Sequence, residues 1–107
     1  MSEFAVGGSD TGKSFTLHPG DVLNLRLPET QTAGYQWRID TIDPNVLALR
    51  SSTYAAPQGA AAGASGMRTI LIDAVASGET LLRLASRRAW EKASGGGEEF
   101  EISVLVR

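Results

Sequence analysis

The feature that most constrains this 107-residue chain is the alternation of apolar and polar residues over short runs. Leu23, Leu25 and Leu27 alternate with polar residues in one run, and the last run alternates from Phe100 to Val106. Side chains two residues apart lie on the same face of an extended strand, so this period predicts half-buried strands. Six runs are predicted as strands: 22–27, 35–39, 46–53, 67–76, 80–86 and 100–106. Since no run of about eleven residues or more carries a helical period, the chain is predicted to be all-β.

The connections between these runs fall into two classes by length. Short turns are expected at 19–20, 43–45 and 77–79. Longer loops are expected at 28–34, 54–66 and 87–97. In a chain that runs up and down, successive connections alternate between the two ends, so the longer loops should share one end, where binding residues concentrate. The pattern predicts an immunoglobulin-like β-sandwich of seven or eight mostly antiparallel strands that binds a partner through this loop end.

Composition excludes several classes of function. The formal net charge of −2 argues against nucleic acid or an anionic membrane as the main partner, because both require a basic excess. The chain has no cysteine and one histidine, His18, which is predicted to be a surface turn residue. A thiolate metal site, a cysteine nucleophile and a serine–histidine triad are therefore excluded, and no enzymatic activity or cofactor is expected. The apolar runs are far shorter than the roughly 18 residues of a membrane-spanning helix, so no membrane partner is expected. The protein is predicted to be a monomer.

The first thirteen residues are rich in Gly, Ser and Asp and have no periodicity. We predict a flexible N-terminal tail over residues 1–13 and a single domain over 14–107. The segment from Gly7 to Ser14 matches the phosphate-loop pattern G-x-x-x-x-G-K-[ST], but that chemistry needs a buried strand before it and a helix after it. The sequence predicts neither, so this motif is rejected. Without a signal-peptide pattern, the chain is expected in the cytosol as written, or in the periplasm or outside the cell if a leader is missing.

The last run carries acidic residues on its outward face. Glu99 and Glu101 share that face with Ser103. Paired carboxylates can serve acid–base catalysis, but charges on an exposed edge strand also deter edge-to-edge aggregation. We interpret the two glutamates as protection of an exposed edge.

The three longer loops hold residues that packing does not explain. In the first, Gly34 can adopt a positive φ, and Trp37 just beyond it is predicted to lie in the core. The second has almost no side chains over 59–66, so it is expected either to be disordered or to lie flat against a partner. In the third, Trp90 lies close to Arg88, a mixture enriched at interface hot spots, although Arg88 alone could equally be a solvated charge.

Together these loops resemble the chagasin family (inhibitor family I42) of cysteine-protease inhibitors, which carries N-P-T-T-G, G-x-G-G and R-P-W on three successive loops. The resemblance extends from about Gly20 to the C-terminus. The residues at the matching positions are Thr30, Gln31, Thr32, Ala33 and Gly34 in the first loop, Gly63, Ala64, Ser65 and Gly66 in the second, and Arg88, Ala89 and Trp90 in the third. The resemblance implies that these residues bind a protease.

The implied function is reversible, non-covalent inhibition of papain-like cysteine proteases, with the three loops occluding the active-site cleft. The chain departs from the family pattern where Thr30, Gln31, Ala33, Ser65 and Ala89 replace Asn, Pro, Thr, Gly and Pro. Loss of two prolines leaves the free loops with more conformations to lose on binding. These departures keep a second class open, an immunoglobulin-like protein-binding or adhesion module without a protease target.

Overall fold

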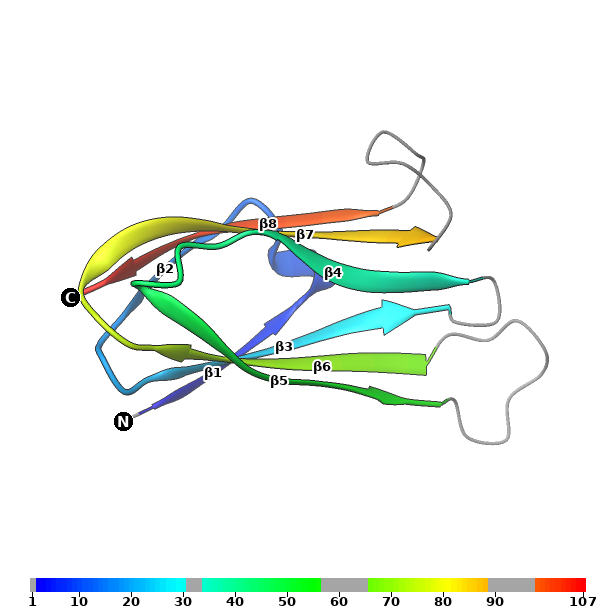
Figure 1. Cartoon of the computed structure of the whole chain (residues 1–107), viewed down its shortest axis with the longest axis horizontal. Helices are drawn as coiled ribbons and strands as arrows, with labels where there is room; N and C mark the ends of the chain where they lie inside the picture. The colour runs from blue at the N-terminus through cyan, green and yellow to red at the C-terminus, as the bar shows by residue number, and fades with distance from the viewer. Residues whose placement is uncertain (1, 31–33, 57–65, 89–97) are drawn as a thin grey trace.

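The computed structural model describes residues 2–30, 34–56, 66–88 and 98–107. They form two packed four-stranded sheets, ordered β1-β3-β6-β5 and β2-β8-β7-β4 (Figure 1). The strands are β1 (Glu3–Gly7), β2 (Ser14–Leu17), β3 (Val22–Glu29), β4 (Tyr35–Thr41), β5 (Leu47–Ala55), β6 (Gly66–Ala74), β7 (Gly78–Arg88) and β8 (Glu99–Val106), with one 3₁₀ turn, η1 (Gly8–Asp10). Over these ranges no helix is long and apolar enough to cross a membrane. The predicted all-β sandwich is confirmed.

The core lies between the two sheets and is built by the alternating residues of the sequence. Leu23, Leu25 and Leu27 of β3 are buried from one side, and Ile102 and Val104 of β8 are buried from the other. Each such side chain stabilises the fold by roughly 1.5–3 kcal/mol through its removal from water. The period of two in the sequence therefore corresponds to one face of each sheet that is buried in the core and one that faces outward.

Strand pairing is mostly antiparallel, as predicted, with parallel pairs only at β1–β3 and β2–β8 within the described residues. The chain is not a simple up-and-down sheet, because β5–β6 and β7–β8 are the consecutive strands that pair, and the other connections cross between sheets. Strand direction nevertheless alternates from β3 to β8 (Figure 1). Successive connections therefore lie at alternate ends of the sandwich, as predicted from the sequence.

The first strand overturns the prediction of a flexible tail over residues 1–13. β1 pairs in parallel with β3, and Val6 is buried between the sheets. The carboxylate of Asp21 holds the beginning of this strand, because it accepts hydrogen bonds from the backbone N–H groups of Ser2 (2.8 Å) and His18 (2.8 Å). The apolar alternation in β1 spans too few residues to stand out in a glycine- and serine-rich segment. Its pairing partner is also distant in the sequence.

The segment that matches the phosphate-loop pattern is built unlike a phosphate site. It does follow a strand, but a single 3₁₀ turn and then β2 come after that strand in place of an α-helix. Several of its backbone N–H groups already donate within the protein, among them Gly7 to Asp10 Oδ2 (2.9 Å) and Gly12 to the carbonyl of Glu101 (2.7 Å). The Lys13 ammonium bonds Asp10 Oδ1 at 2.9 Å. These groups are therefore engaged in holding η1 and β2 in place.

The prediction of an exposed edge strand is wrong for Glu101. β8 lies between β2 and β7 in its sheet, and although β2 pairs only with Ser103–Val106, the carbonyl of Glu101 accepts from the Gly12 N–H at 2.7 Å. Arg83 Nε of β7 pairs with Glu101 Oε1 at 2.9 Å across the outer face. The backbone N–H of Glu101 donates to Thr11 Oγ1 at 3.1 Å. The acidic outer face thus contributes a cross-strand ion pair, which is typically worth about 0.2–1 kcal/mol.

Candidate functional site

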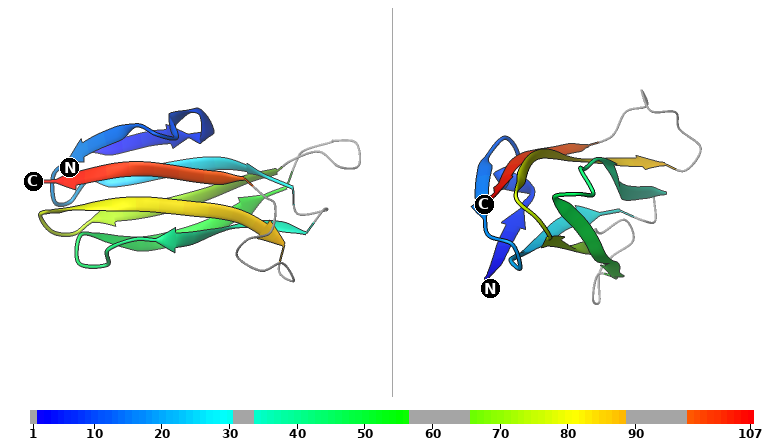
Figure 2. Two further views of the ribbon diagram at one scale, coloured as in Figure 1. Left: turned by 90° about the horizontal axis from the view of Figure 1, so that it is seen from above. Right: turned by 60° about the vertical axis from the view of Figure 1, so that its left-hand side comes forward.

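The strand ends that flank the three longer loops lie together at one end of the sandwich (Figures 1 and 2). Strand pairing joins them directly, since Glu29 is opposite Gly66 and Tyr35 is opposite Arg88. Four of the predicted contact residues are described by the structure: Thr30, Gly34, Gly66 and Arg88. The others lie outside the described residues: Gln31, Thr32, Ala33, Gly63, Ala64, Ser65, Ala89 and Trp90. The structure therefore defines the base from which the loops leave the sheets.

The base of the first loop is closed by hydrogen bonds on both sides. The backbone N–H of Tyr35 donates to the Thr30 carbonyl at 3.3 Å, and Trp37 Nε1–H donates to the Pro28 carbonyl at 2.8 Å. Gly34 has φ = 86°, a left-handed conformation in which a side chain is strained, so the predicted positive φ of this glycine is confirmed. These contacts fix where the chain leaves β3 and where it enters β4.

Trp37 is a core residue, as predicted, with 5% of its surface exposed. It packs in the cluster of buried residues between the sheets, and its indole N–H is satisfied by the carbonyl of Pro28. A buried tryptophan with a bonded N–H combines a large apolar contact with a directional anchor. Trp37 therefore acts beneath the loop and holds its base.

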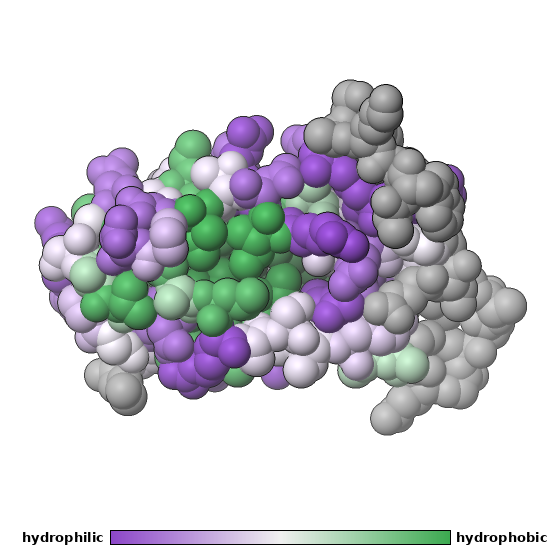
Figure 3. Space-filling model, in the orientation of Figure 1, coloured by the Kyte–Doolittle hydropathy of each residue, from purple (hydrophilic) through white to green (hydrophobic). Residues whose placement is uncertain are grey.

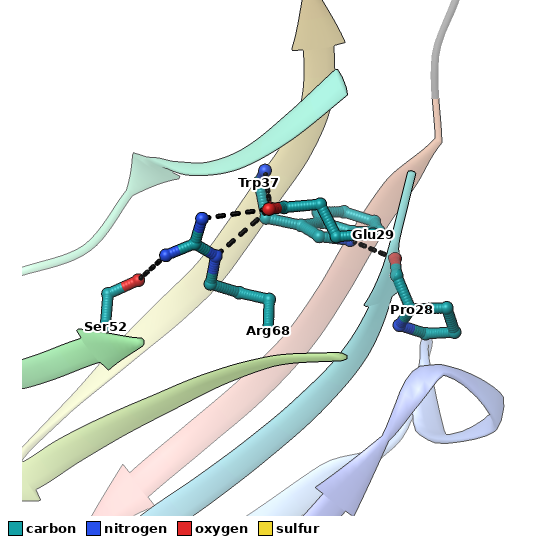
Figure 4. A network of polar contacts seen from close by, with 5 residues as sticks. All are labelled: Pro28, Glu29, Trp37, Ser52 and Arg68. Carbon is teal, nitrogen blue, oxygen red and sulfur yellow. Dashed lines mark hydrogen bonds and ion pairs between the residues drawn. The ribbon is translucent and has the colours of Figure 1, made fainter. Parts of the chain in front are cut away.

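A buried ion pair lies beside Trp37 (Figure 4). The Glu29 carboxylate at the end of β3 is fully buried and accepts from Arg68 of β6, with Arg68 Nη2 to Oε1 at 2.8 Å and Arg68 Nε to Oε2 at 3.1 Å. Glu29 Oε2 also accepts from the backbone N–H of Trp37 at 2.7 Å. Because β3 and β6 belong to one sheet and β4 to the other, this carboxylate joins the two layers at the loop end.

Sequence reasoning did not single out this pair, although a signal was present. Glu29 continues the inward parity of Leu25 and Leu27, and Arg68 has the inward parity of Ile70. An acid and a base at inward positions of two predicted strands are candidates for a buried pair, because an unpaired buried charge is costly. The strand order needed to place them side by side was not available from the alternation.

Gly66, the last residue of the second motif, is buried against its own sheet. A Cβ atom built at this position would lie 2.3 Å from Tyr54 Oη and 2.4 Å from the Ala55 carbonyl oxygen, both far inside van der Waals contact. The Arg68 guanidinium lies over the ring of the same Tyr54, 5.7 Å from its centroid. Packing within the domain is therefore sufficient to require glycine at position 66.

The third loop begins after two adjacent arginines at the end of β7, Arg87 and Arg88. The Arg88 guanidinium lies over the ring of Tyr35, 4.7 Å from its centroid, and Arg87 makes two hydrogen bonds of 3.2 Å to the Asp40 carboxylate. Stacking on an aromatic ring restricts the conformations of the arginine side chain. Arg88 is thus half-buried and aligned with the first loop through Tyr35.

A separate groove of about 310 Å³ runs along the open side of the sandwich between β4 and β5, where Figure 3 shows apolar side chains gathered. Its apolar lining includes Ile39, Leu49 and Ile70. Its polar lining residues are Arg38 and Ser52, and Ser52 Oγ already accepts from Arg68 Nη1 at 3.2 Å. The groove therefore offers little to orient a small ligand, which needs several convergent polar groups.

Within the described ranges, no cluster of three or more His, Cys, Asp or Glu side chains is arranged to hold a metal ion. Asp10 and Asp21, two described carboxyl groups with lowered pKa values, lie near the N-terminal strand. Backbone hydrogen bonds, from Gly7 to Asp10 and from His18 and Ser2 to Asp21, are the main cause of each lowered pKa. The described part of the loop end presents strand ends and an arginine stacked on a tyrosine ring.

The described residues form a β-sandwich in which the bases of the three loops lie together at one end. The chain belongs to the chagasin family of peptidase inhibitors, family I42, whose model matches residues 16–104. Membership in this family makes the protein an inhibitor rather than an enzyme. Comparison with curated protein sequences gave no significant match.

Solved structures with the same fold include the cysteine protease inhibitor EhICP2 from Entamoeba histolytica, with 20% identity, a TM-score of 0.85 and coverage of 100% of this chain and 97% of that one. Amebosin is similar with 23% identity, a TM-score of 0.78 and coverage of 98% of both chains. PbICP-C, solved in complex with falcipain-2, has 14% identity, a TM-score of 0.71 and coverage of 100% of both chains. These likenesses agree with the sandwich described above over nearly the whole chain.

Proposed function

We propose that this protein is a reversible, non-covalent inhibitor of papain-like cysteine proteases. The observation that carries the proposal is the family match over residues 16–104, which spans all three loops and the strand ends that hold them. Two of the structural neighbours support it, since EhICP2 is described as a cysteine protease inhibitor and PbICP-C was solved in complex with falcipain-2.

The proposed mechanism is occlusion of the active-site cleft. The loop from Thr30 to Gly34 enters the cleft beside the catalytic cysteine and histidine of the protease. The segments from Gly63 to Gly66 and from Arg88 to Trp90 contact the two walls of the cleft. Three loops at one end of a sandwich suit an interface of standard size, which buries roughly 800 Å² on each partner. These segments carry no electrophile that could react with the protease thiolate, so the complex is held by non-covalent contacts alone.

The described base of the site supports this mechanism physically. Closing a loop costs conformational entropy, and a loop whose ends are already fixed loses less of it on binding. The first loop leaves β3 and enters β4 at a base closed by the Tyr35–Thr30 and Trp37–Pro28 hydrogen bonds. A base of this kind favours slow dissociation of the complex, because affinity differences among related complexes arise mostly in the dissociation rate.

The test is inhibition of papain and of a cathepsin-L-like enzyme. We expect activity to fall with inhibitor concentration, to recover on dilution, and to leave the inhibitor uncleaved by mass spectrometry. Thr32→Arg, placed in the first loop, should weaken inhibition by about tenfold or more, as expected at the centre of an interface. Asn45→Arg, at an exposed position of the opposite end, is the matched control and should inhibit like the unmodified protein.

A second candidate function is an immunoglobulin-like protein-binding or adhesion module without a protease target. The replacements at Thr30, Gln31 and Ala89 favour it, since they remove the asparagine and both prolines of the family motifs. Absence of inhibition of several papain-like enzymes at tens of micromolar would leave this function in place of the first.

A further inference from the structure

The Glu29–Arg68 pair occupies a position that packing alone does not demand. Both side chains are almost completely removed from solvent, with exposed fractions of 0% and 8%. Removing two charges from water is costly, and replacing a buried ion pair by apolar residues of similar size is often neutral or stabilising. A contribution to overall stability is therefore a weak explanation for a buried pair at this place.

The contacts of the pair are directional on every side. Arg68 presents two donors to the two oxygens of Glu29, donates through Nη1 to Ser52 Oγ, and lies over the ring of Tyr54. Glu29 Oε2 accepts in addition from the backbone N–H of Trp37 (Figure 4). A planar guanidinium bound at two points has one orientation, so the carboxylate beside it is held in one orientation as well.

These contacts join the starting points of two loops. Glu29 directly precedes Thr30, and its strand neighbour across the sheet is Gly66, the last residue of the second motif. Arg68 follows Gly66 by two residues, and Tyr54 lies on the strand that leads into the second loop. The bond to Trp37 ties the exit of the first loop to its entry, because Trp37 follows Gly34 by three residues.

We propose that the Glu29–Arg68 pair is a positioning clamp that holds the first and second loops in one relative placement for docking on the protease. The inference rests on the proposed inhibitory function and assigns Glu29 and Arg68 a role through the loops, without contact with the protease. A loop base that is fixed before binding spares the entropy of ordering it in the complex. Loss of the clamp therefore weakens binding even when the domain stays folded.

The test is the double variant Glu29→Met with Arg68→Met, which removes both charges together and leaves neither one buried alone. We expect it to melt close to the unmodified protein and to inhibit papain about tenfold to a hundredfold more weakly, the range that lost preorganisation produces. The matched control is Arg50→Met with Asp73→Met. This pair is also a two-point arginine–carboxylate contact, but it is exposed and lies away from the loop bases. The control should change inhibition by less than about twofold.

Amide hydrogen exchange separates a clamp from a purely structural pair. The Tyr35 amide donates to the Thr30 carbonyl, an acceptor that the double variant retains. If the clamp positions the loop, exchange at Tyr35 should accelerate by about tenfold or more in the double variant, while exchange at Val104 in the centre of β8 stays unchanged. A folded double variant with unaltered Tyr35 exchange, or with unaltered inhibition, overturns the proposal.

Two further results remain decisive. If the double variant does not fold, Arg68→Lys keeps a cation beside Glu29 but lacks the two-point contact, so it should accelerate Tyr35 exchange and weaken inhibition in the same direction. Unchanged exchange and inhibition in a folded Arg68→Lys variant also overturn the clamp. If the unmodified protein inhibits no papain-like protease, the proposed function fails, and exchange at Tyr35 alone then decides whether the pair holds the loop base.

Discussion

At the loop end of the sandwich, the strand ends are held from below by side chains in the core, whereas at the opposite end carboxylates bond directly to the backbone of the turns. At the loop end, the support consists of the Glu29–Arg68 ion pair and two hydrogen bonds of Trp37, one from its backbone N–H to Glu29 and one from its indole N–H to the Pro28 carbonyl. At the opposite end, the Asp21 carboxylate accepts from two backbone N–H groups, and Asp43 Oδ1 accepts from the backbone N–H of Asn45 at 2.9 Å.

This difference teaches how one small domain separates stability from binding. At the turn end, the carboxylates of Asp21 and Asp43 stabilise the turns themselves through hydrogen bonds to backbone N–H groups. At the loop end, the bracing residues lie outside the predicted contact set, apart from the carbonyl of Thr30 and the packed Gly66. Substitutions in the predicted contact residues should therefore change binding more than folding. Among the bracing residues, loss of Trp37 should change folding, whereas loss of the Glu29–Arg68 pair as a unit should change binding.

The largest expected effect concerns the two tryptophans. Trp37→Ala should lower the free energy of unfolding by about 3–5 kcal/mol, because it empties a core site and frees the Pro28 carbonyl. Trp90→Ala should change it by about 0.5 kcal/mol or less but weaken inhibition. Urea unfolding followed by fluorescence gives both values. A larger loss of stability for Trp90→Ala than for Trp37→Ala would mean that the third loop packs on its own domain. The proposed separation between residues for binding and residues for stability would then be wrong.

A smaller effect is expected from adding one methyl group at the loop end. Gly66→Ala should cost about 1–3 kcal/mol, since its Cβ would overlap Tyr54 and the Ala55 carbonyl, and the strands must shift to admit it. Gly7→Ala is the control, because a Cβ there meets no atom within 4 Å. Equal unfolding free energies for the two variants would show that the base of the second loop yields more readily than its packing implies.

Restoring the two prolines of the family motifs should change the loops without changing the residues that hold their bases. Gln31→Pro with Ala89→Pro should strengthen inhibition by roughly fivefold to thirtyfold, since each proline removes about 0.4–1 kcal/mol of backbone entropy from the free state. The gain should appear as slower dissociation in surface plasmon resonance. Weaker binding by a normally folded double variant would argue that the loops of this chain do not adopt the bound geometry of the family.

The smallest effect is confined to acid and belongs to the turn end. Backbone hydrogen bonds from His18 and Ser2 hold the pKa of Asp21 below its ordinary value. Stability from this carboxylate is therefore present above the unfolded pKa of about 3.9 and is lost as the pH falls through the lower folded pKa. Asp21→Asn should be less stable than the unmodified protein at pH 7, and the gap should narrow at pH 2. A gap that does not change with pH would remove the ionised carboxylate from the explanation.

The parts of the fold that follow from local pattern were predictable. The alternation of Phe100, Ile102, Val104 and Val106 corresponds to a strand with one buried face, and Trp37 lies in the core as its place after Gly34 implies. Alternating strand direction was sufficient to gather the loop bases at one end. For the binding residues, prediction rested on short motifs, and the structure describes the bases that carry them.

The parts that depend on contacts distant in the sequence were not predictable from period alone. β1 has a short apolar alternation, and its stability comes from β3 and from Asp21, residues that the local pattern does not connect to it. The same holds for Glu29 and Arg68, which are 39 residues apart and meet only because β3 and β6 are neighbours. Sheet order also decides that β8 lies between β2 and β7, which a row of alternating charges cannot reveal.

Gly66 has a consequence for how such chains diverge. Because Tyr54 and Ala55 leave no room for a side chain there, purifying selection on folding alone would keep this glycine in a lineage that had stopped inhibiting proteases. Arg88 lies over the Tyr35 ring, a contact whose loss costs less than a steric overlap with backbone, so selection on folding would hold this position less strictly. In descendants of this chain, retention of Gly66 would therefore record ancestry, and joint retention of the first and third motifs would record continued use.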